Sequence, residues 1–168
     1  VMPGSLLITE TNVPHKENIS YFGQGDEAHM VYQFPLPPLT LHAFLSQDSS
    51  VLTEWAKGLT SEAMASLQAG SKTTYFNFLA SHDGIGVRPT EGILSDDDRH
   101  MMCQQVERKG GRVNYKNNGD GTQSQYELNI NYLSAITEPE DDAQTKAAKF
   151  LAAQSILLSF IGITPKFY

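Results

Sequence analysis

Short strand-like runs alternate with helix-like segments along this 168-residue chain, and this alternation restricts the fold more than any other feature. The run Leu6-Leu7-Ile8 is continuously apolar and has polar or turn-forming neighbours, which predicts a strand buried on both faces of a sheet. Three further strands are predicted, at 30–34, 73–80 and 163–168. Helices are predicted between them, at 35–44, 50–67 and 145–160. This order predicts an α/β fold with a parallel sheet.

Two segments interrupt this regular order. Residues 13–27 lack periodicity and are expected to form a polar loop. Residues 84–141 separate the third strand from the last helix, which is a long connection for a strand and a helix in one sheet and predicts a functional insertion. Within it, Ser95-Asp96-Asp97-Asp98 predicts a capped helix start. The segment 117–121 predicts a tight turn, because its Asn, Asp and Gly residues lack the frame of a calcium loop.

The composition excludes several classes of protein. Hydrophobic residues make up 40% of the chain, which excludes disorder, and the length suits one domain. The formal charge of −7 argues against nucleic acid or an anionic membrane as the main partner. The apolar stretch 150–163 is interrupted by polar residues and is too short to span a bilayer, and no secretory signal is visible. The single cysteine, Cys103, fits a reducing compartment, so a cytoplasmic location is expected.

Two acidic residues follow predicted strands directly. Glu10 comes after the first apolar run, and Asp83 comes after the third predicted strand. The carboxyl ends of parallel strands converge on the ligand crevice, so these two residues are candidates for one site. A pair of carboxylates there suits glycosyl transfer, where one acts as an acid and the other stabilises positive charge on the sugar. For each residue alone, a carboxylate that caps a loop remains the alternative.

The residues around both acids resemble motifs of a known superfamily. The segments 8–15 (ITETNVPH) and 78–86 (FLASHDGIG) look like two signature regions of the α-amylase superfamily. His-Asp-Gly-Ile-Gly-Val at 82–87, together with Tyr-Glu-Leu-Asn at 126–129, resembles the sucrose phosphorylase subfamily, which also contains phosphorylases of glucosylglycerate and related glucosides. This resemblance implies a partial (β/α)8 TIM barrel that covers about strands five to eight. Residues 1–168 would then be the C-terminal half of the catalytic domain, with 84–141 as an insertion after strand seven that shapes the acceptor side.

The resemblance also implies roles for individual residues. Glu10 corresponds to the general acid/base, Asp83 to the acid that stabilises the oxocarbenium-like transition state, and His82 to its hydrogen-bonding neighbour on the sugar. Five more residues are candidate ligands of the acceptor or of phosphate: Asn12, His15, Arg88, Tyr126 and Glu127. Sucrose-specific relatives resemble this chain there but carry His at position 12 and Gln at position 127, so an acceptor other than fructose is expected. An arginine fork at Arg88 or Arg112 would suit orthophosphate or a glycerate carboxylate. An exposed loop pair for His15 and Lys16, and a surface salt bridge for Arg88 or Arg112, remain alternatives.

The implied reaction is the cleavage of an α-glucoside by orthophosphate to α-glucose 1-phosphate with retention, which needs neither a metal nor an organic cofactor. The family's nucleophile is an Asp in an Arg-x-Asp motif on strand four, and the chain contains no such motif. The 168 residues are therefore expected to be inactive alone, with a complementing N-terminal half as partner. A hydrolase or transglucosylase of the same superfamily is one alternative. A non-catalytic half-barrel that self-associates through its open sheet edges is another.

Overall fold

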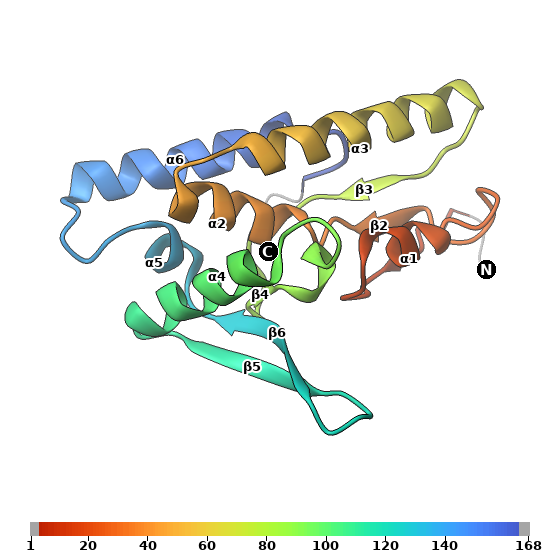
Figure 1. The fold of residues 1–168 in the computed structure, drawn as a ribbon. Coiled ribbons are helices and arrows are strands. Elements are labelled where there is room, and N and C mark those ends of the chain that lie inside the picture. The colour runs from red at the N-terminus through yellow and green to blue at the C-terminus, as the bar shows by residue number, and fades with distance from the viewer. Residues whose placement is uncertain (1–3, 165–168) are drawn as a thin grey trace.

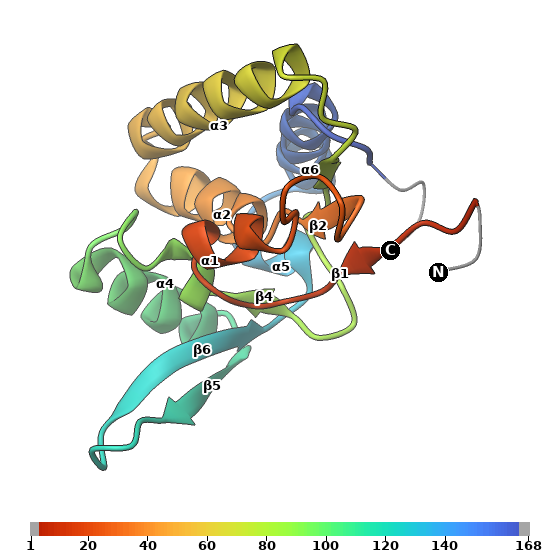
Figure 2. The same ribbon diagram turned by 90° about the vertical axis from the view of Figure 1, so that its right-hand side faces the viewer.

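A computed structural model describes residues 4–164 and contains a parallel sheet of three strands. The strands are β1 (Ile8–Thr9), β2 (Met30–Tyr32) and β3 (Thr74–Phe76), and they lie in this order in the sheet. Figure 1 labels β2 and β3, and Figure 2 labels β1 and β2. Ile8 pairs with Met30, and Tyr32 pairs with Phe76. Ile163 forms a parallel bridge to Phe76, beyond β3. The predicted parallel α/β arrangement is thus confirmed, and the carboxyl ends of the strands share one edge.

Helices connect these strands. Helix α1 (His15–Ser20) follows β1, and helices α2 (Leu36–Ser46) and α3 (Ser50–Gln68) follow β2. Helix α6 (Ala143–Ser159) leads to the bridge at Ile163. Figure 1 shows α3 and α6 side by side on one side of the molecule. No helix among the described residues is long and apolar enough to cross a membrane.

A second, antiparallel sheet lies between β3 and α6 in the sequence. It contains β4 (Ile85–Gly86), β5 (Arg112–Asn117) and β6 (Gln123–Asn129), in the order β4-β6-β5. Three helical segments accompany it: η1 (Arg88–Thr90), α4 (Asp96–Arg108) and α5 (Tyr132–Ile136). The β5–β6 hairpin projects from the body of the molecule (Figure 2). This region falls within the predicted insertion at 84–141.

One hydrophobic core joins the two regions. Leu36, Leu39 and Leu41 of α2 are fully buried against Met102 of α4 and Leu128 of β6, and all five belong to one cluster. Cys103 is also buried there, as the sequence predicts. The same burial raises the pKa of its thiol to about 11, so the thiol stays protonated near neutral pH.

Ser95 begins α4, as the sequence predicts. Its hydroxyl accepts a hydrogen bond from the Asp98 backbone N–H at 3.1 Å, and the Asp98 carboxylate accepts one from the Ser95 backbone N–H at 3.2 Å. This reciprocal pair is a capping box, which satisfies two backbone donors at the start of the helix.

Other expectations about the elements are wrong. Leu6, Leu7 and Ile8 are 40–66% exposed rather than buried on both faces, because β1 is a two-residue strand at the edge of the sheet. The expected loop at 13–27 contains α1, which starts after Pro14 and buries Asn18. The third strand ends at Phe76 rather than continuing to residue 80. Of the last predicted strand, Ile163 alone is paired among the described residues, and residues 165–168 lie outside them.

Candidate active site

Glu10 follows β1 directly, at the carboxyl edge of the parallel sheet, and its side chain is exposed. Thr9 pairs with Val31, so an extension of the register by one residue brings Glu10 level with Tyr32. Successive side chains of a strand point to opposite faces, and Glu10 therefore shares the face of Tyr32 rather than that of Val31.

That face carries an aromatic cluster which the sequence analysis missed. Tyr32 stacks on Phe76 with ring centroids 4.6 Å apart, and Phe34 meets Phe78 edge to face at 5.3 Å. Tyr32 also contacts Phe78 at 5.3 Å, so the four rings are continuous. The signal is visible in the sequence as aromatic residues at alternate positions, 32/34 and 76/78, at the ends of two neighbouring strands. The result is an apolar floor beside the end of β1.

The segment after Glu10 lies against the motif at 82–87. A Cβ atom built on Gly86 would lie only 2.8 Å from both the Nδ2 and the Oδ1 atoms of Asn12. Figure 2 shows the corresponding arrangement, in which the loop after β1 runs beside β4. The two segments that resemble the superfamily motifs are therefore neighbours in space. Residue 86 must be glycine for Asn12 to approach so closely.

Asp83, Glu127 and Asn129 form a polar cluster next to this contact. Glu127 is the pairing partner of Gly86 in the antiparallel sheet. Partial burial raises the pKa of the Glu127 carboxyl, the Asp83 charge raises it further, and a hydrogen bond with the Asn129 side chain opposes both effects. A carboxyl group held in this way takes up a proton more readily than an isolated surface glutamate.

His82 and Asp83 are both exposed at the tip of the turn into β4. The His82 Nε2 atom lies 3.3 Å from the Asp83 Oδ1 atom, and the Asp83 backbone N–H donates to the Ser81 hydroxyl at 3.2 Å. This turn is closed by Gly84, whose φ of +92° and close approach to the Leu128 carbonyl exclude any side chain. The pair therefore projects outward from a tight turn and is accessible to solvent.

Arg88 and Tyr126 lie at the other end of the same motif. The Val87 backbone N–H donates to the Tyr126 carbonyl at 3.0 Å, and Arg88 then begins η1. Both Arg88 and Tyr126 are half-buried. Together with Asn12, Asp83 and Glu127, they border the antiparallel sheet around β4.

His15 is not part of this grouping. Its Nε2 atom lies 3.2 Å from the Glu62 carboxylate of α3, and its ring is 6.3 Å from that of Tyr75, which packs against Phe22. These contacts hold the imidazole between α1 and α3, and we leave it out of the site proposed below.

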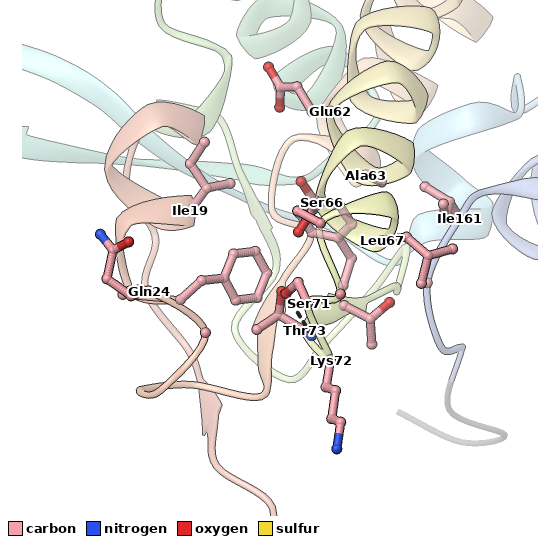
Figure 3. Close-up of a pocket in the computed structure, with 18 residues that line it drawn as sticks. Ile19, Gln24, Glu62, Ala63, Ser66, Leu67, Ser71, Lys72, Thr73 and Ile161 are labelled. Carbon is pink, nitrogen blue, oxygen red and sulfur yellow. Dashed lines mark hydrogen bonds between the residues drawn. The ribbon is translucent and has the colours of Figure 1, made fainter.

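A cavity of about 1010 Å³ lies in the same region as His15 (Figure 3). It is bounded by Ile19 and Phe22, by Leu67 of α3, by Tyr75 and by Ile161, and none of the eight predicted site residues lines it. Among the described residues, no group of three or more His, Cys, Asp or Glu side chains could hold a metal ion.

Comparisons with known proteins agree with the motifs. No family model matches the chain. A glucosylglycerate phosphorylase of Spirochaeta thermophila is 56% identical over 97% of this chain, and a sucrose phosphorylase of Streptococcus mutans is 29% identical over 83% of it. The crystal structure of a sucrose 6F-phosphate phosphorylase from Thermoanaerobacter thermosaccharolyticum superimposes on 96% of the chain with a TM-score of 0.71 at 20% identity, which shows that the fold is shared.

The chain spans about a quarter of the length of the curated relatives it matches, 26% for each of these two phosphorylases, and 29% of the solved chain. The chain shares its parallel α/β fold with this solved phosphorylase, and its two motif segments meet at Asn12 and Gly86. It belongs to the α-amylase superfamily, in the branch that contains the sucrose and glucosylglycerate phosphorylases.

Proposed function

We propose that the full-length protein is a retaining phosphorylase that cleaves glucosylglycerate with orthophosphate and releases α-glucose 1-phosphate and glycerate. The observation that carries this proposal is the 56% identity with a glucosylglycerate phosphorylase, against 29% with a sucrose phosphorylase. Asn12 and Glu127, where sucrose-specific relatives differ, flank Gly86 from the loop after β1 and from β6. Their position supports a role in the choice of acceptor.

In the proposed mechanism Glu10 is the general acid. It donates its proton to the glycosidic oxygen as the bond between that oxygen and the anomeric carbon breaks, and a carboxylate nucleophile bonds to the carbon from the opposite face. Orthophosphate then attacks the same carbon, gives its proton to the Glu10 carboxylate and displaces the nucleophile. Asp83 and His82 hold the sugar hydroxyls, and the Asp83 charge stabilises the oxocarbenium-like transition state.

The nucleophile would come from a part of the protein outside these 168 residues, because no Arg-x-Asp motif occurs among them. In this proposal β1, β2, β3 and the segment at Ile163 are strands five to eight of a (β/α)8 barrel, and 84–141 is an insertion on the acceptor side. The parallel order of the four segments supports the assignment. The isolated chain would then bind sugar weakly and catalyse nothing.

The test is to incubate the full-length protein with glucosylglycerate, with and without orthophosphate, and to quantify glucose 1-phosphate and glucose. The proposal predicts glucose 1-phosphate only when phosphate is present, and a much higher kcat/KM for glucosylglycerate than for sucrose. Release of free glucose at the same rate without phosphate would identify a hydrolase instead. A higher kcat/KM for sucrose than for glucosylglycerate would contradict the proposal that glycerate is the acceptor.

A further inference from the structure

The antiparallel sheet presents one polar face, and its register defines which residues share it. Leu128 is fully buried in the core with Ile85, and Val113 packs against the same cluster. Side chains alternate along each strand, so the neighbours of these residues point to the opposite face. There the register gives the row Gly86-Glu127-Asn114 and pairs Asn129 with Arg112, and Asn129 lies beside Gly84 at the start of β4.

At the β4 end, the space that a Cβ would fill on each glycine is already occupied, by Asn12 at Gly86 and by Leu128 and Asn129 at Gly84. Asn12 covers Gly86, and Asp83 precedes Gly84, so both glycines lie at the candidate active site. Directly paired residues of an antiparallel sheet have Cβ atoms about 4.5–5.5 Å apart. Asn129 is therefore about one strand spacing from Gly84, and Arg112 is about two strand spacings from it. The side chains of Glu127 and Asn129 are joined by a hydrogen bond.

Arg112 is the cation of this face, and its guanidinium is free. It is exposed, and among residues 4–164 it forms no side-chain hydrogen bond or ion pair. By contrast, Arg99 and Arg108, the arginines of α4, are both paired with carboxylates. A guanidinium presents a planar fork of donors that matches an oxyanion in two-point contact.

We propose that Arg112, with the Asn129 amide beside it, binds the oxyanion of the ligand that enters the acceptor side of this site, and that this oxyanion is the carboxylate of the glycerate group. The inference rests on the proposed function and deepens it. Glu127 and Asp83 repel an anion, so a carboxylate that reaches this face needs a compensating cation. Orthophosphate presents the same chemistry, and the experiment separates the two.

The experiment compares Arg112→Gln and Arg112→Lys with the unaltered full-length protein. Phosphorolysis is followed with glucosylglycerate and with glucosylglycerol, which carries a hydroxymethyl group in place of the carboxylate, at several phosphate concentrations. Lys57→Gln is the matched control: it also removes one positive charge, but on an exposed site of α3 where Lys57 pairs only with Glu54. Isothermal titration of glycerate and of phosphate gives the affinities without turnover.

We expect Arg112→Gln to raise the KM for glucosylglycerate about ten- to hundredfold, which is the loss of a charge-assisted contact. The KM for glucosylglycerol and for phosphate should stay within twofold of the control, and Arg112→Lys should restore part of the affinity, because it keeps the charge but not the fork. Glycerate binding should weaken in parallel.

If Arg112→Gln raised the KM for phosphate and not the KM for glucosylglycerate, this would contradict the assignment to the glycerate carboxylate. It would show instead that Arg112 binds phosphate. Equal effects of Arg112→Gln and Lys57→Gln in both assays would overturn the proposal. If the unaltered protein does not cleave glucosylglycerate at all, the proposed function fails. The titrations then still decide about Arg112, since unchanged binding of glycerate would overturn its role.

Discussion

Glu10, the proposed proton donor, lies at the end of a strand, on the face that carries the aromatic cluster and next to the loop that contacts the 82–87 motif. Its exposure in residues 4–164 leaves the carboxyl group accessible to a ligand. The Asp83 side chain is also exposed, and its backbone is held by the turn at Gly84 and by the hydrogen bond that its N–H donates to the Ser81 hydroxyl. The two acids thus come from independent elements, as a division of roles between acid and charge stabiliser requires.

Replacement of Glu10 by Gln in the full-length protein removes the acid but keeps the size of the side chain. We expect kcat/KM for glucosylglycerate to fall by about 10²–10⁴, the usual contribution of general acid catalysis. Glucosyl fluoride should be affected far less, because fluoride leaves without a proton. The measurement is the rate of glucose 1-phosphate formation from each of the two substrates. An equal fall in kcat/KM for both substrates would show that Glu10 is a structural residue and not the acid.

Gly86 is the point where the two motif segments touch. The Cβ of Gly86→Ala would lie 2.8 Å from both polar atoms of the Asn12 amide, so the amide must move away. We expect kcat/KM to fall at least tenfold while the melting temperature changes little, since a side chain and not the backbone yields. Gly58→Ala in α3 is the control. Nothing lies within 4 Å of its added Cβ, and alanine favours a helix by about 1 kcal/mol over glycine.

If Gly86→Ala retained full activity with an unchanged KM, the close approach of Asn12 would have no part in the site. A large fall in melting temperature would instead show that the contact holds the fold together. Both readouts are therefore needed, and the Gly58→Ala control calibrates the second.

At the scale of elements, a cluster of charges joins the end of α4 to the chain after α5. Glu138 lies 2.6 Å from Arg108 Nη2 and 3.0 Å from Lys109 Nζ, and Lys109, with a side chain only 3% exposed, also donates to the Ala135 carbonyl at 2.7 Å. The hydrogen bond from Arg108, more than that from Lys109, holds the pKa of Glu138 below its usual value of 4.5. This cluster anchors the base of the β5–β6 hairpin to the core.

The lowered pKa makes the contribution of Glu138 depend on pH. A carboxyl group whose pKa is lower in the folded state stabilises it above the unfolded pKa of 4.5, and this stability is lost as the pH falls through the folded value. Glu138→Gln should lower the free energy of unfolding at pH 7 by about 0.5–1 kcal/mol, because the carboxylate is 37% exposed and therefore screened by solvent, and because Lys109 keeps its carbonyl acceptor. At pH 3 the free energies of unfolding of the variant and of the unaltered protein should differ much less, because the Glu138 carboxylate is then largely protonated.

Urea unfolding at both pH values measures this difference. As a control, Glu54→Gln removes an exposed carboxylate that pairs only with the exposed Lys57 and should change stability by less than about 0.5 kcal/mol. A Glu138→Gln effect as large at pH 3 as at pH 7 would contradict a role through the charged form.

The elements also show how far the sequence alone reaches. The start of α4 was predictable because the capping box at Ser95 and Asp98 is local. The polar composition of 13–27 does not indicate α1. This helix is held against the sheet by its buried Asn18, whose side-chain amide donates a hydrogen bond to the Tyr32 carbonyl at 2.7 Å. The apolar run at 6–8 was assigned to a buried strand, but burial depends on neighbours in space, and β1 has β2 on one side only among the described strands.

In the candidate site, the individual residues that belong to local sequence motifs could be predicted from the sequence. Which of these residues lie close together in space could not. The contact of Asn12 with Gly86 and the cluster of Asp83, Glu127 and Asn129 join segments distant in sequence. His15 is a candidate from the sequence because it follows Glu10 in a loop that is expected to line the site. Its pairing with Glu62 depends on the packing of α1 against α3, which no local pattern shows.

At the scale of the whole molecule, the exposed edge of β1 predicts association of the isolated 168-residue chain. Leu6 is 66% exposed and Ile8 42%, and an open apolar edge is a template for another strand. We expect light scattering to show dimers or larger species whose fraction grows with concentration, and Ile8→Lys to reduce them. The full-length protein, whose remaining strands would cover this edge, is the reference. A chain that stays monomeric at every concentration contradicts the open edge.

We propose that the ends of β1 and β3 hold one sugar between them, and a crystal structure of full-length Glu10→Gln with glucosylglycerate bound is the decisive experiment. We expect the glucosyl hydroxyls to contact His82 and Asp83, and the glycosidic oxygen to lie within hydrogen-bond distance of the residue-10 amide. The glycerate carboxylate should lie on the β5–β6 face. A ligand seated in the cavity between α1 and α3, or an Asp83 side chain directed away from the bound sugar, would contradict this proposal.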